Sequence, residues 1–146
     1  MLNCPFCEID KTRTRVIQET LHARVILSNP RLMPGHTLVI PKRHIEKPSE
    51  FTAEERQEIF NTVLAMQEKI MAVFSSGCDI RQNCRPFMPQ SRVKVDHVHF
   101  HLQPREMEDE LYQVSQIHEK QLWQDLAQEE MEKFLERFHP PVSSIC

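Results

Sequence analysis

The segment KVDHVHFHLQPR, residues 94–105, decides the fold because it places three histidines at every second position. The β-branched, aromatic and aliphatic residues between them predict a strand that begins near residue 93 and that Pro104 ends. Successive side chains of a strand point to opposite faces. One face carries Val95, His97, His99 and His101, and the other carries Val98, Phe100 and Leu102. We expect the apolar face to lie against the core.

The three histidines form a row on one surface of this strand. With a rise of about 3.3 Å per residue, neighbouring imidazoles stand roughly 7 Å apart, so that they can share one extended ligand. An imidazole is partly neutral near pH 7 and can act as a nucleophile or a proton donor. Two other interpretations of the row are ordinary surface histidines and ligands of a catalytic zinc. Against the zinc, no third-ligand motif of the usual kind accompanies the strand.

The segments that flank this strand predict an antiparallel sheet. Residues 20–30 and 35–44 are rich in β-formers and are separated by the turn-forming NPRLMPG, which predicts two neighbouring antiparallel strands. A further short strand is expected at 78–83. These segments favour a sheet of about five antiparallel strands.

One long helix is predicted to accompany the sheet. Thr52 and Glu55 have the spacing of a capping box, and apolar residues then recur every three or four positions over about 53–75. The fold class is therefore α+β. The acidic, helix-forming tail predicts a globular core at 1–105 and a C-terminal helical extension at 106–146, packed on or next to the core.

The composition excludes several kinds of partner and location. The net charge is -3 with neutral histidines and there is no basic run, which argues against a nucleic-acid duplex as partner. No apolar run approaches the roughly 20 residues of a membrane span, and the first residues hold no apolar signal segment. The five cysteines, an odd number, indicate reduced thiols rather than a secreted disulfide framework. We expect a cytoplasmic protein without a membrane partner.

Three ordered motifs resemble the histidine triad (HIT) superfamily. HVHFHLQ, residues 97–103, is similar to its His-X-His-X-His-X-X signature, with apolar residues at X except for Gln103. PGHTLVIPKRH at 34–44 resembles the segment before the long helix, and CPFCEI at 4–9 resembles the Cys-X-X-Cys of the zinc-binding branch. The resemblance covers 4–105, which is roughly the whole globular core.

This resemblance implies a nucleotide hydrolase or nucleotidyl transferase that acts at the α-phosphate through a covalent nucleotidyl-histidine. His99 corresponds to the nucleophile, and His101 to the residue that contacts the phosphate and assists the leaving group. The implied substrate is a purine nucleotide such as a dinucleoside polyphosphate or a nucleoside phosphoramidate. The resemblance also implies a homodimer in which the long helix and a strand edge meet their symmetry mates.

Further residues match positions that contact the nucleotide in this family. His36 corresponds to a histidine that lines the nucleotide pocket, and Asn83 to an asparagine on the phosphate side. Ser28, or Asn29 beside it, corresponds to a polar ribose contact. Some apolar residues are expected to pack on the base, although they fit a position in the hydrophobic core equally well: Phe6, Ile9 and Leu27.

Cys4 and Cys7 need two further ligands to hold a tetrahedral zinc ion. Zinc-binding members of the superfamily use the positions of His44 and His97, so the resemblance implies a closed Cys2His2 site with a structural role. A redox dithiol is an alternative, but such a pair follows a strand and opens a helix, and only three residues precede Cys4. A pair of buried thiols without metal is the other alternative.

The loop before the histidine row departs from the family, in which it is Gly-rich and carries Gln-Ser or Gln-Thr close to the first histidine. This loop has no glycine and is longer. We assign phosphate contacts to Gln90, Ser91 and Lys94 on this weaker match. Arg92 and Lys94 add positive charge that suits a polyphosphate leaving group.

The intact pair of His99 and His101 favours an enzyme over two other functions. One is a nucleotide-binding module that senses nucleotides without catalysis. The other is a metal-dependent hydrolase in which the histidine row holds the zinc.

Overall fold

A computed structural model describes residues 3–116 and 121–139 of the chain. The chain divides into two compact units, Met1–Ser115 and Gln116–Cys146. The first unit contains the sheet and the long helix. The functional division between 1–105 and 106–146 stays a prediction.

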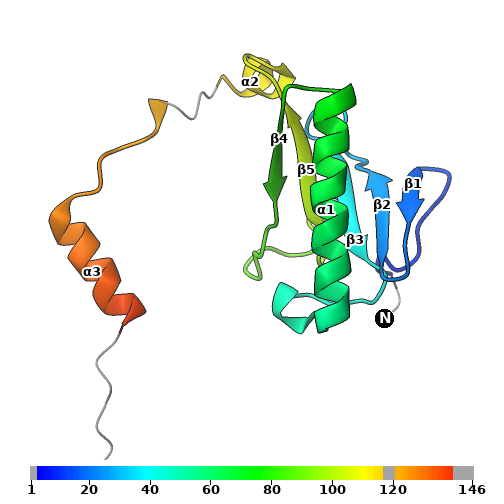
Figure 1. The fold of residues 1–146 in the computed structure, drawn as a ribbon, viewed down its shortest axis with the longest axis horizontal. Helices are drawn as coiled ribbons and strands as arrows, with labels where there is room; N and C mark the ends of the chain where they lie inside the picture. The colour runs from blue at the N-terminus through cyan, green and yellow to red at the C-terminus, as the bar shows by residue number, and fades with distance from the viewer. Residues whose placement is uncertain (1–2, 117–120, 140–146) are drawn as a thin grey trace, which may run out of the picture. The chain divides into compact units, whose positions relative to one another are not determined.

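Five antiparallel strands form one sheet (Figure 1). They are β1 (Val16–Glu19), β2 (Ala23–Leu27), β3 (Thr37–Pro41), β4 (Gly77–Arg81) and β5 (Phe100–Arg105). Their order across the sheet is β1-β2-β3-β5-β4, so β3 and β5 lie in the interior and β4 at an edge. The α+β class and the antiparallel pairing of β2 with β3 are confirmed. β1 was not predicted as a strand, because VIQE is too short to show a period.

The expected strand of the histidine row is wrong at both ends. It begins at Phe100 rather than near residue 93, because the backbone N–H of Val98 donates to the Ile45 carbonyl (2.8 Å) and not to a strand neighbour. Pro104 lies inside β5 and does not end it. The pairing of β3 with β5 stops at Leu102, so β5 is bordered at Pro104 by β4 alone and tolerates the missing N–H.

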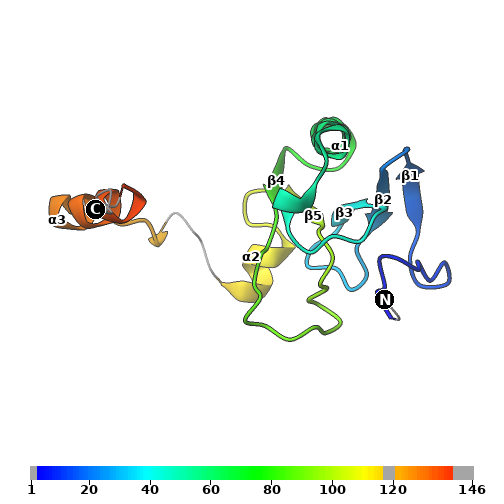
Figure 2. The same cartoon turned by 90° about the horizontal axis from the view of Figure 1, so that it is seen from below.

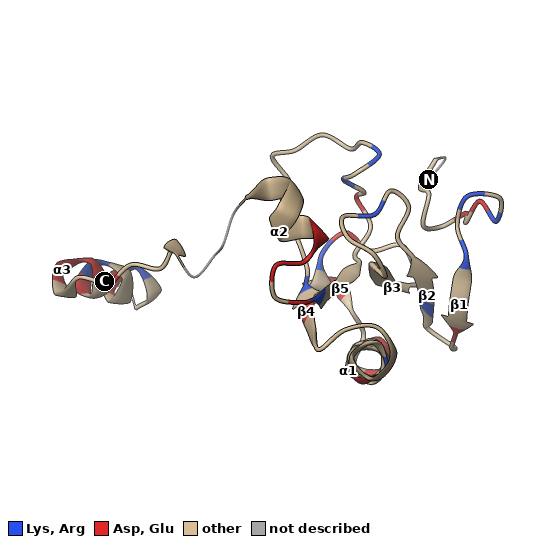
Figure 3. Cartoon of the chain, turned by 90° about the horizontal axis from the view of Figure 1, so that it is seen from above, with Lys and Arg blue, Asp and Glu red and all other residues tan. Residues whose placement is uncertain are grey.

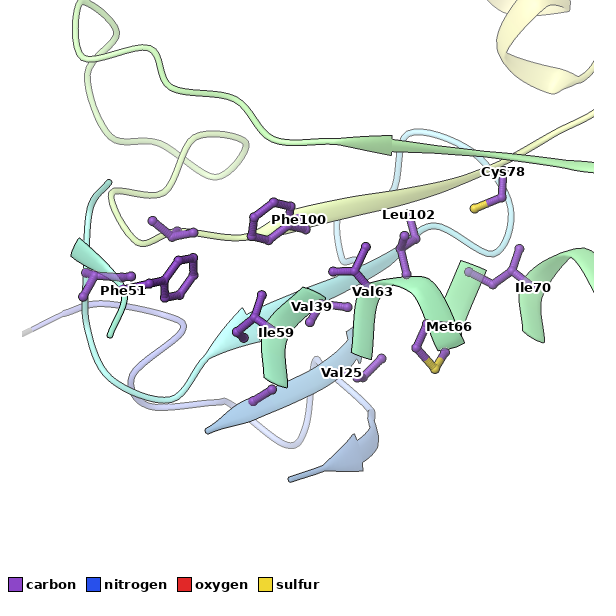
Figure 4. Packing of buried hydrophobic residues seen from close by; sticks show 13 residues of the cluster. Val25, Val39, Phe51, Ile59, Val63, Met66, Ile70, Cys78, Phe100 and Leu102 are labelled. Atoms are coloured by element: carbon purple, nitrogen blue, oxygen red, sulfur yellow. The ribbon is translucent and has the colours of Figure 1, made fainter. Parts of the chain in front are cut away.

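The long helix α1 (Ala53–Val73) covers one face of the sheet, as Figures 1 and 2 show. Its N-cap is Thr52, and the predicted capping box with Glu55 is present in both directions. A short 3-10 helix, η1 (Pro48–Glu50), precedes it. Apolar side chains of α1 interdigitate with those of the sheet in the main core, which Figure 4 shows in close view. The core consists of Ala23, Val25, Val39, Ile45, Phe51, Ile59, Val63, Met66, Ile70, Cys78, Val98, Phe100 and Leu102.

The opposite face of the sheet carries the N-terminal segment and the loop between β4 and β5 (Figure 2). A second apolar cluster lies there, in which Phe6 and Ile9 pack against strand residues. Its buried members are Ile26, Leu38 and Ile40. β3 is buried along its whole length because both faces are covered.

Among the described residues, two α-helices follow β5. α2 (Glu110–Ser115) belongs to the first unit, and α3 (Gln128–Phe138) belongs to the second. Residues 117–120 and 140–146 of the predicted C-terminal extension lie outside the described residues. No helix within the described ranges is long and apolar enough to cross a membrane.

Candidate active site and metal cluster

Four potential metal ligands from three distant segments meet at one point: Cys4, Cys7, His44 and His97. Their ligand atoms all lie within 4.8 Å of one another. A tight turn, in which the Cys7 N–H donates to the Cys4 carbonyl (3.1 Å), brings the two thiols together. The structure thus brings together all four residues that the sequence analysis assigned to the metal.

The spacing of these atoms fits a tetrahedral zinc ion. The Nδ1 of His97 lies 3.4 Å from Cys4 Sγ and 3.6 Å from Cys7 Sγ, and the Nδ1 of His44 lies 3.3 Å from Cys7 Sγ. Tetrahedral zinc with Zn–S of about 2.3 Å and Zn–N of about 2.05 Å separates sulfur and nitrogen ligands by about 3.6 Å. The observed separations are therefore those of neighbouring ligands around one ion.

The protonation chemistry of the cluster fits a metal as well. Burial, followed by the neighbouring Cys4 thiol, raises the pKa of Cys7, so two adjacent thiolates need a cation to compensate their charge. Burial lowers the pKa of His97 to about 4, which keeps the ring neutral, as a ligand must be. The Nε2 of His97 donates to the Pro41 carbonyl (2.9 Å), and this contact turns Nδ1 toward the thiols.

A cavity of about 360 Å³ lies on the sheet face opposite α1 and contains both His99 and His101 in its lining. One part of its wall is apolar and comes from Phe6, Ile9, Ile26 and Leu38. The polar predicted residues that line it are Ser28, Asn29, His36 and Asn83. The cavity therefore combines an apolar surface for a flat ring with a group of hydrogen-bonding side chains.

The surroundings of His99 define which ring nitrogen is free. Its Nδ1 lies 2.7 Å from the backbone carbonyl of His97, and because a carbonyl only accepts, Nδ1 must carry the proton. Burial lowers the pKa of His99, which favours the neutral ring. The Nε2 of a neutral ring in this tautomer has a free lone pair. Phe6 contacts the ring edge-on, with ring centroids 5.1 Å apart, and holds its orientation.

His36 determines the tautomer of His101 through two successive hydrogen bonds. The Leu32 N–H donates to His36 Nδ1 (3.0 Å), so Nδ1 is the acceptor and Nε2 carries the proton of the neutral ring. His36 Nε2 lies 2.8 Å from His101 Nδ1 and donates to it. His101 in turn carries its proton on Nε2. Two of the histidines that line the cavity therefore differ: His99 offers a lone pair at Nε2, and His101 offers an N–H.

Low pKa values keep this chain of hydrogen bonds neutral. Burial, and after it the nearby His99, lowers the pKa of His36 to about 4. Burial, then His99 and His36, and then Arg81, lower the pKa of His101 to about 3. Both rings are therefore uncharged near pH 7.

His36 is positioned by the turn that precedes β3. Gly35 has a φ of +76°, a conformation that side chains disfavour, and an added Cβ would lie 3.0 Å from Pro104 Cγ. Glycine at this position lets the turn pass close to β5. The imidazole of His36 can then reach His101 on the neighbouring strand.

Four predicted nucleotide contacts do not line the cavity. Leu27 lies two positions from the core residue Val25, on the side of the sheet that faces α1, whereas Ile26 faces the cavity. The side chains of the other three, Gln90, Ser91 and Lys94, instead form hydrogen bonds or an ion pair within their own loop. Gln90 Oε1 accepts from the Asp96 N–H, Ser91 Oγ accepts from the Val93 N–H, and Lys94 pairs with Asp96.

Several lining residues were not identified from the sequence. Arg81 and Gln103 face the cavity because of strand register, which a single sequence does not give. Ile26 and Leu38 could have been found, since strict alternation along the two predicted strands places them on one face. Arg31 and Arg85 also line the cavity and lie in loops without a recognisable motif.

The HIT domain family matches residues 10–108, and the chain belongs to this family. It is 36% identical over 107 residues to "Protein hit" of Bacillus subtilis, covering 70% of this chain and 71% of that protein. It is 31% identical to adenosine 5'-monophosphoramidase hnt1 of Schizosaccharomyces pombe, over 74% of this chain and 78% of that protein. It is 29% identical to a bis(5'-nucleosyl)-tetraphosphatase of the same yeast, over 66% of this chain and 52% of that protein.

Solved structures of the family share the fold. A HIT family member from Bacillus subtilis superposes with a TM-score of 0.69 at 29% identity, covering 97% of this chain and 99% of that one. A zinc-bound histidine triad family protein from Mycobacterium smegmatis superposes with a TM-score of 0.62 at 26% identity, covering 75% of this chain and 80% of that one.

Proposed function

We propose that this protein is a nucleotide hydrolase or nucleotidyl transferase that works at the α-phosphate through a covalent bond to His99. The observation that carries the proposal is the opposite tautomers of two neighbouring imidazoles in one cavity. A lone pair at His99 Nε2 suits a nucleophile, and an N–H at His101 Nε2 suits a donor to the leaving group. The relatives named as a tetraphosphatase and a phosphoramidase support the same chemistry.

In the first step, His99 Nε2 attacks the α-phosphorus and forms a P–N bond. The bond from phosphorus to the leaving group breaks, and its electron pair stays on the departing oxygen or nitrogen. The Nε2–H of His101 donates a hydrogen bond to that atom, and because His101 is a neutral ring, the proton that a basic amine takes up comes from solvent. The N–H at His99 Nδ1 keeps its hydrogen bond to the His97 carbonyl, and this hydrogen bond stabilises the positive charge that develops on the ring.

In the second step, water attacks the same phosphorus and the P–N bond breaks. The electron pair returns to His99 Nε2, the hydroxyl joins the nucleotide, and the proton of the water is released to solvent. The products are a nucleoside monophosphate and the protonated leaving group. Attack by another hydroxyl in place of water would make the same protein a nucleotidyl transferase.

The apolar wall of the cavity supports a purine base as the part that is bound there. Phe6 and Ile9 come from the N-terminal segment, and Ile26 and Leu38 from β2 and β3. These side chains form an apolar surface for a flat ring. Ser28 and Asn29 lie in the same lining and are the ribose contacts in this proposal.

The zinc ion of this proposal is structural. Four protein ligands complete a tetrahedral shell and leave no position for water, so that the metal stabilises the fold and takes no part in the phosphoryl chemistry. His97 belongs to the cluster, whereas His99 and His101 line the cavity. This separation does not favour the alternative in which the histidine row binds a catalytic zinc.

The homodimer of this proposal rests on one surface of the first unit. β4 is an edge strand, and the apolar side chains of Phe60, Leu64, Met71 and Ile80 are 40% to 54% exposed. An edge strand and an apolar helix face next to it are what a symmetric pair of chains can cover. We also keep the cytoplasm as the proposed location, since the thiols of the metal cluster need reducing conditions.

The covalent step is tested by trapping the nucleotide on the chain. Adenosine 5'-phosphoramidate labelled at its phosphorus is mixed with the protein, and the reaction is quenched in denaturant during turnover. We expect label on the wild-type chain that mild acid releases. His99→Asn removes the nucleophile and should carry no label, with turnover lower by about a thousandfold or more.

His22→Asn is the matched control, because His22 pairs with Glu58 outside the cavity. This variant should label and turn over as the wild type does. An unchanged circular dichroism spectrum and an unchanged thermal unfolding curve in His99→Asn would show that its fold is kept. Near-normal turnover in His99→Asn would refute the covalent mechanism.

A further inference from the structure

The cavity has a basic wall that its proposed function does not yet use. Four arginines line it: Arg31, Arg81, Arg85 and Arg92. No Asp or Glu is among the described residues of the lining. The chain as a whole has the opposite balance, with 21 acidic and 18 basic residues. Positive charge is therefore concentrated at the cavity, although the protein is acidic.

Three of these arginines are available to a ligand. Among the described residues, no carboxylate pairs with Arg81, Arg85 or Arg92. Arg81 makes a hydrogen bond only to a neutral amide, from its Nε to Asn83 Oδ1 (3.1 Å). Arg31 differs, because it is paired with Glu110 at 2.9 Å. Unpaired guanidinium groups beside a cavity are typical of sites that bind phosphate.

The sheet register places the basic wall on the side of the leaving group. Arg81 in β4 is the direct cross-strand partner of His101 in β5. Directly opposite residues of an antiparallel pair point to the same face, with Cβ atoms about 5 Å apart. His101 is the proposed donor to the leaving group, so Arg81 lies where that group departs. The apolar wall of Phe6 and Ile9 belongs to the base instead.

The other two arginines come from the long loop between β4 and β5. Figure 3 shows the basic positions of this loop in blue. Arg85 lies shortly after β4, and Arg92 lies on the return of the loop toward β5. Both line the cavity, although the loop makes no contact to it through Gln90, Ser91 or Lys94. The part of the chain that departs most from the family pattern thus supplies two of the four arginines that line the cavity.

We propose that Arg81, Arg85 and Arg92 form an anion subsite for the leaving group, and that the preferred substrate carries a polyphosphate chain there. This inference rests on the proposed function and narrows it to one of its two substrate types. When His99 Nε2 bonds to the α-phosphorus, the bridging P–O bond breaks and its electron pair stays on the departing phosphate. The departing group gains one negative charge, which the guanidinium groups stabilise.

The test compares two substrates in three proteins. Adenosine 5'-phosphoramidate has a small leaving group that cannot reach the subsite, and diadenosine tetraphosphate has a polyanionic one. We expect the ratio of kcat/KM for the tetraphosphate to that for the phosphoramidate to fall at least tenfold in the double variant Arg85→Ala, Arg92→Ala. Arg56→Ala, an exposed arginine of α1 outside the cavity, should leave the ratio unchanged.

Inorganic tripolyphosphate is the direct probe of the subsite. It should inhibit the wild type competitively, and its inhibition constant should rise at least tenfold in the double variant but not in Arg56→Ala. The inhibition should weaken as salt is added, since screening acts on exposed charges. Replacement of both loop arginines by lysine should restore part of the inhibition, because lysine keeps the charge without the bidentate geometry.

The outcomes separate the two proposals. Turnover of both substrates with an unchanged ratio in the double variant would overturn the anion subsite and leave the proposed function standing. No turnover of either substrate by the wild type would overturn the proposed function and this inference with it.

Discussion

The ion pair between Arg43 and Glu55 fixes the start of α1 next to the proposed metal ligand His44, and its removal should cost measurable stability. Arg43 Nε and Nη2 each lie 2.8 Å from one Glu55 oxygen, and the Thr52 N–H donates to the same carboxylate (2.9 Å). Glu55 is buried, with an exposed fraction of 5%. The hydrogen bond from Arg43 is the main reason that the pKa of Glu55 falls to about 2.

The size of the effect follows from this pKa. The difference between an ordinary value of 4.5 and about 2 corresponds to roughly 3 kcal/mol, at about 1.4 kcal/mol per unit. Because the Arg43 side chain is 49% exposed, solvent screens the pair, and we expect a contribution of about 1 to 2 kcal/mol. A carboxyl group whose pKa is lower in the folded chain than in the unfolded chain stabilises the fold fully at a pH above the pKa of the unfolded chain. Its contribution is therefore present above about pH 4.5 and lost as the pH falls toward 2.

Urea unfolding of Glu55→Gln and the wild type, followed at pH 7 and at steps down to pH 2.5, measures this contribution. The variant should be less stable by about 1 to 2 kcal/mol at pH 7, and the difference between the two proteins should shrink below pH 4.5. Glu54→Gln, on the exposed side of the same helical turn, should lose only a few tenths of a kcal/mol. A stability difference that is independent of pH, or an equal loss in Glu54→Gln, would refute the reasoning.

Three further predictions concern the metal, the dimer and the hydrogen-bond donor to the leaving group. Elemental analysis should find about one zinc per chain, and Cys4→Ser should lose it and lower the Tm, whereas Cys84→Ser, outside the cluster, should do neither; absence of zinc in wild-type protein purified without chelator would contradict the site. Sedimentation should give twice the 17.3 kDa chain mass, and Leu64→Glu should shift it to the monomer; a wild-type monomer at micromolar concentration would count against the dimer. His101→Asn should slow turnover far more for an amine leaving group than for nitrophenolate, which needs no proton; equal slowing would argue against a donor role.

Much of the fold follows from local sequence signals. Thr52, Glu55 and the apolar period after them are enough to place α1, because capping and amphipathicity act within a few turns. The alternation of Val98, Phe100 and Leu102 gives the face that joins the core. The ends of the strands do not follow from local signals, since they depend on which neighbouring strand the backbone pairs with. Only the structure shows that β3 stops pairing at Leu102 and that Pro104 is tolerated beyond it.

Residues of the candidate site that belong to sequence motifs could be predicted. Residues that reach the site only through the register of strand pairing could not. The ligand set of Cys4, Cys7, His44 and His97 could be written down from the family resemblance alone. Arg81 could not, because its position opposite His101 depends on a pairing between two strands about 20 residues apart. The hydrogen bond from His36 to His101 is of the same kind. It joins β5 to the turn before β3, whose approach requires Gly35.

The start of β5 at Phe100, and not ahead of the histidine row as predicted, explains why the Nε2 of His99 is free. In a regular strand, each backbone carbonyl lies in the plane of the sheet and is directed to a neighbouring strand, so it cannot accept from a side chain two residues further on. Because β5 begins only at Phe100, the His97 carbonyl is outside the ladder and accepts from His99 Nδ1 at 2.7 Å. The same residue points its ring at Cys4 and Cys7. His97 therefore places its side chain in the cluster of potential metal ligands and uses its backbone carbonyl to fix the tautomer of His99. A zinc ion bound in that cluster would also hold the carbonyl on which the proposed nucleophile depends.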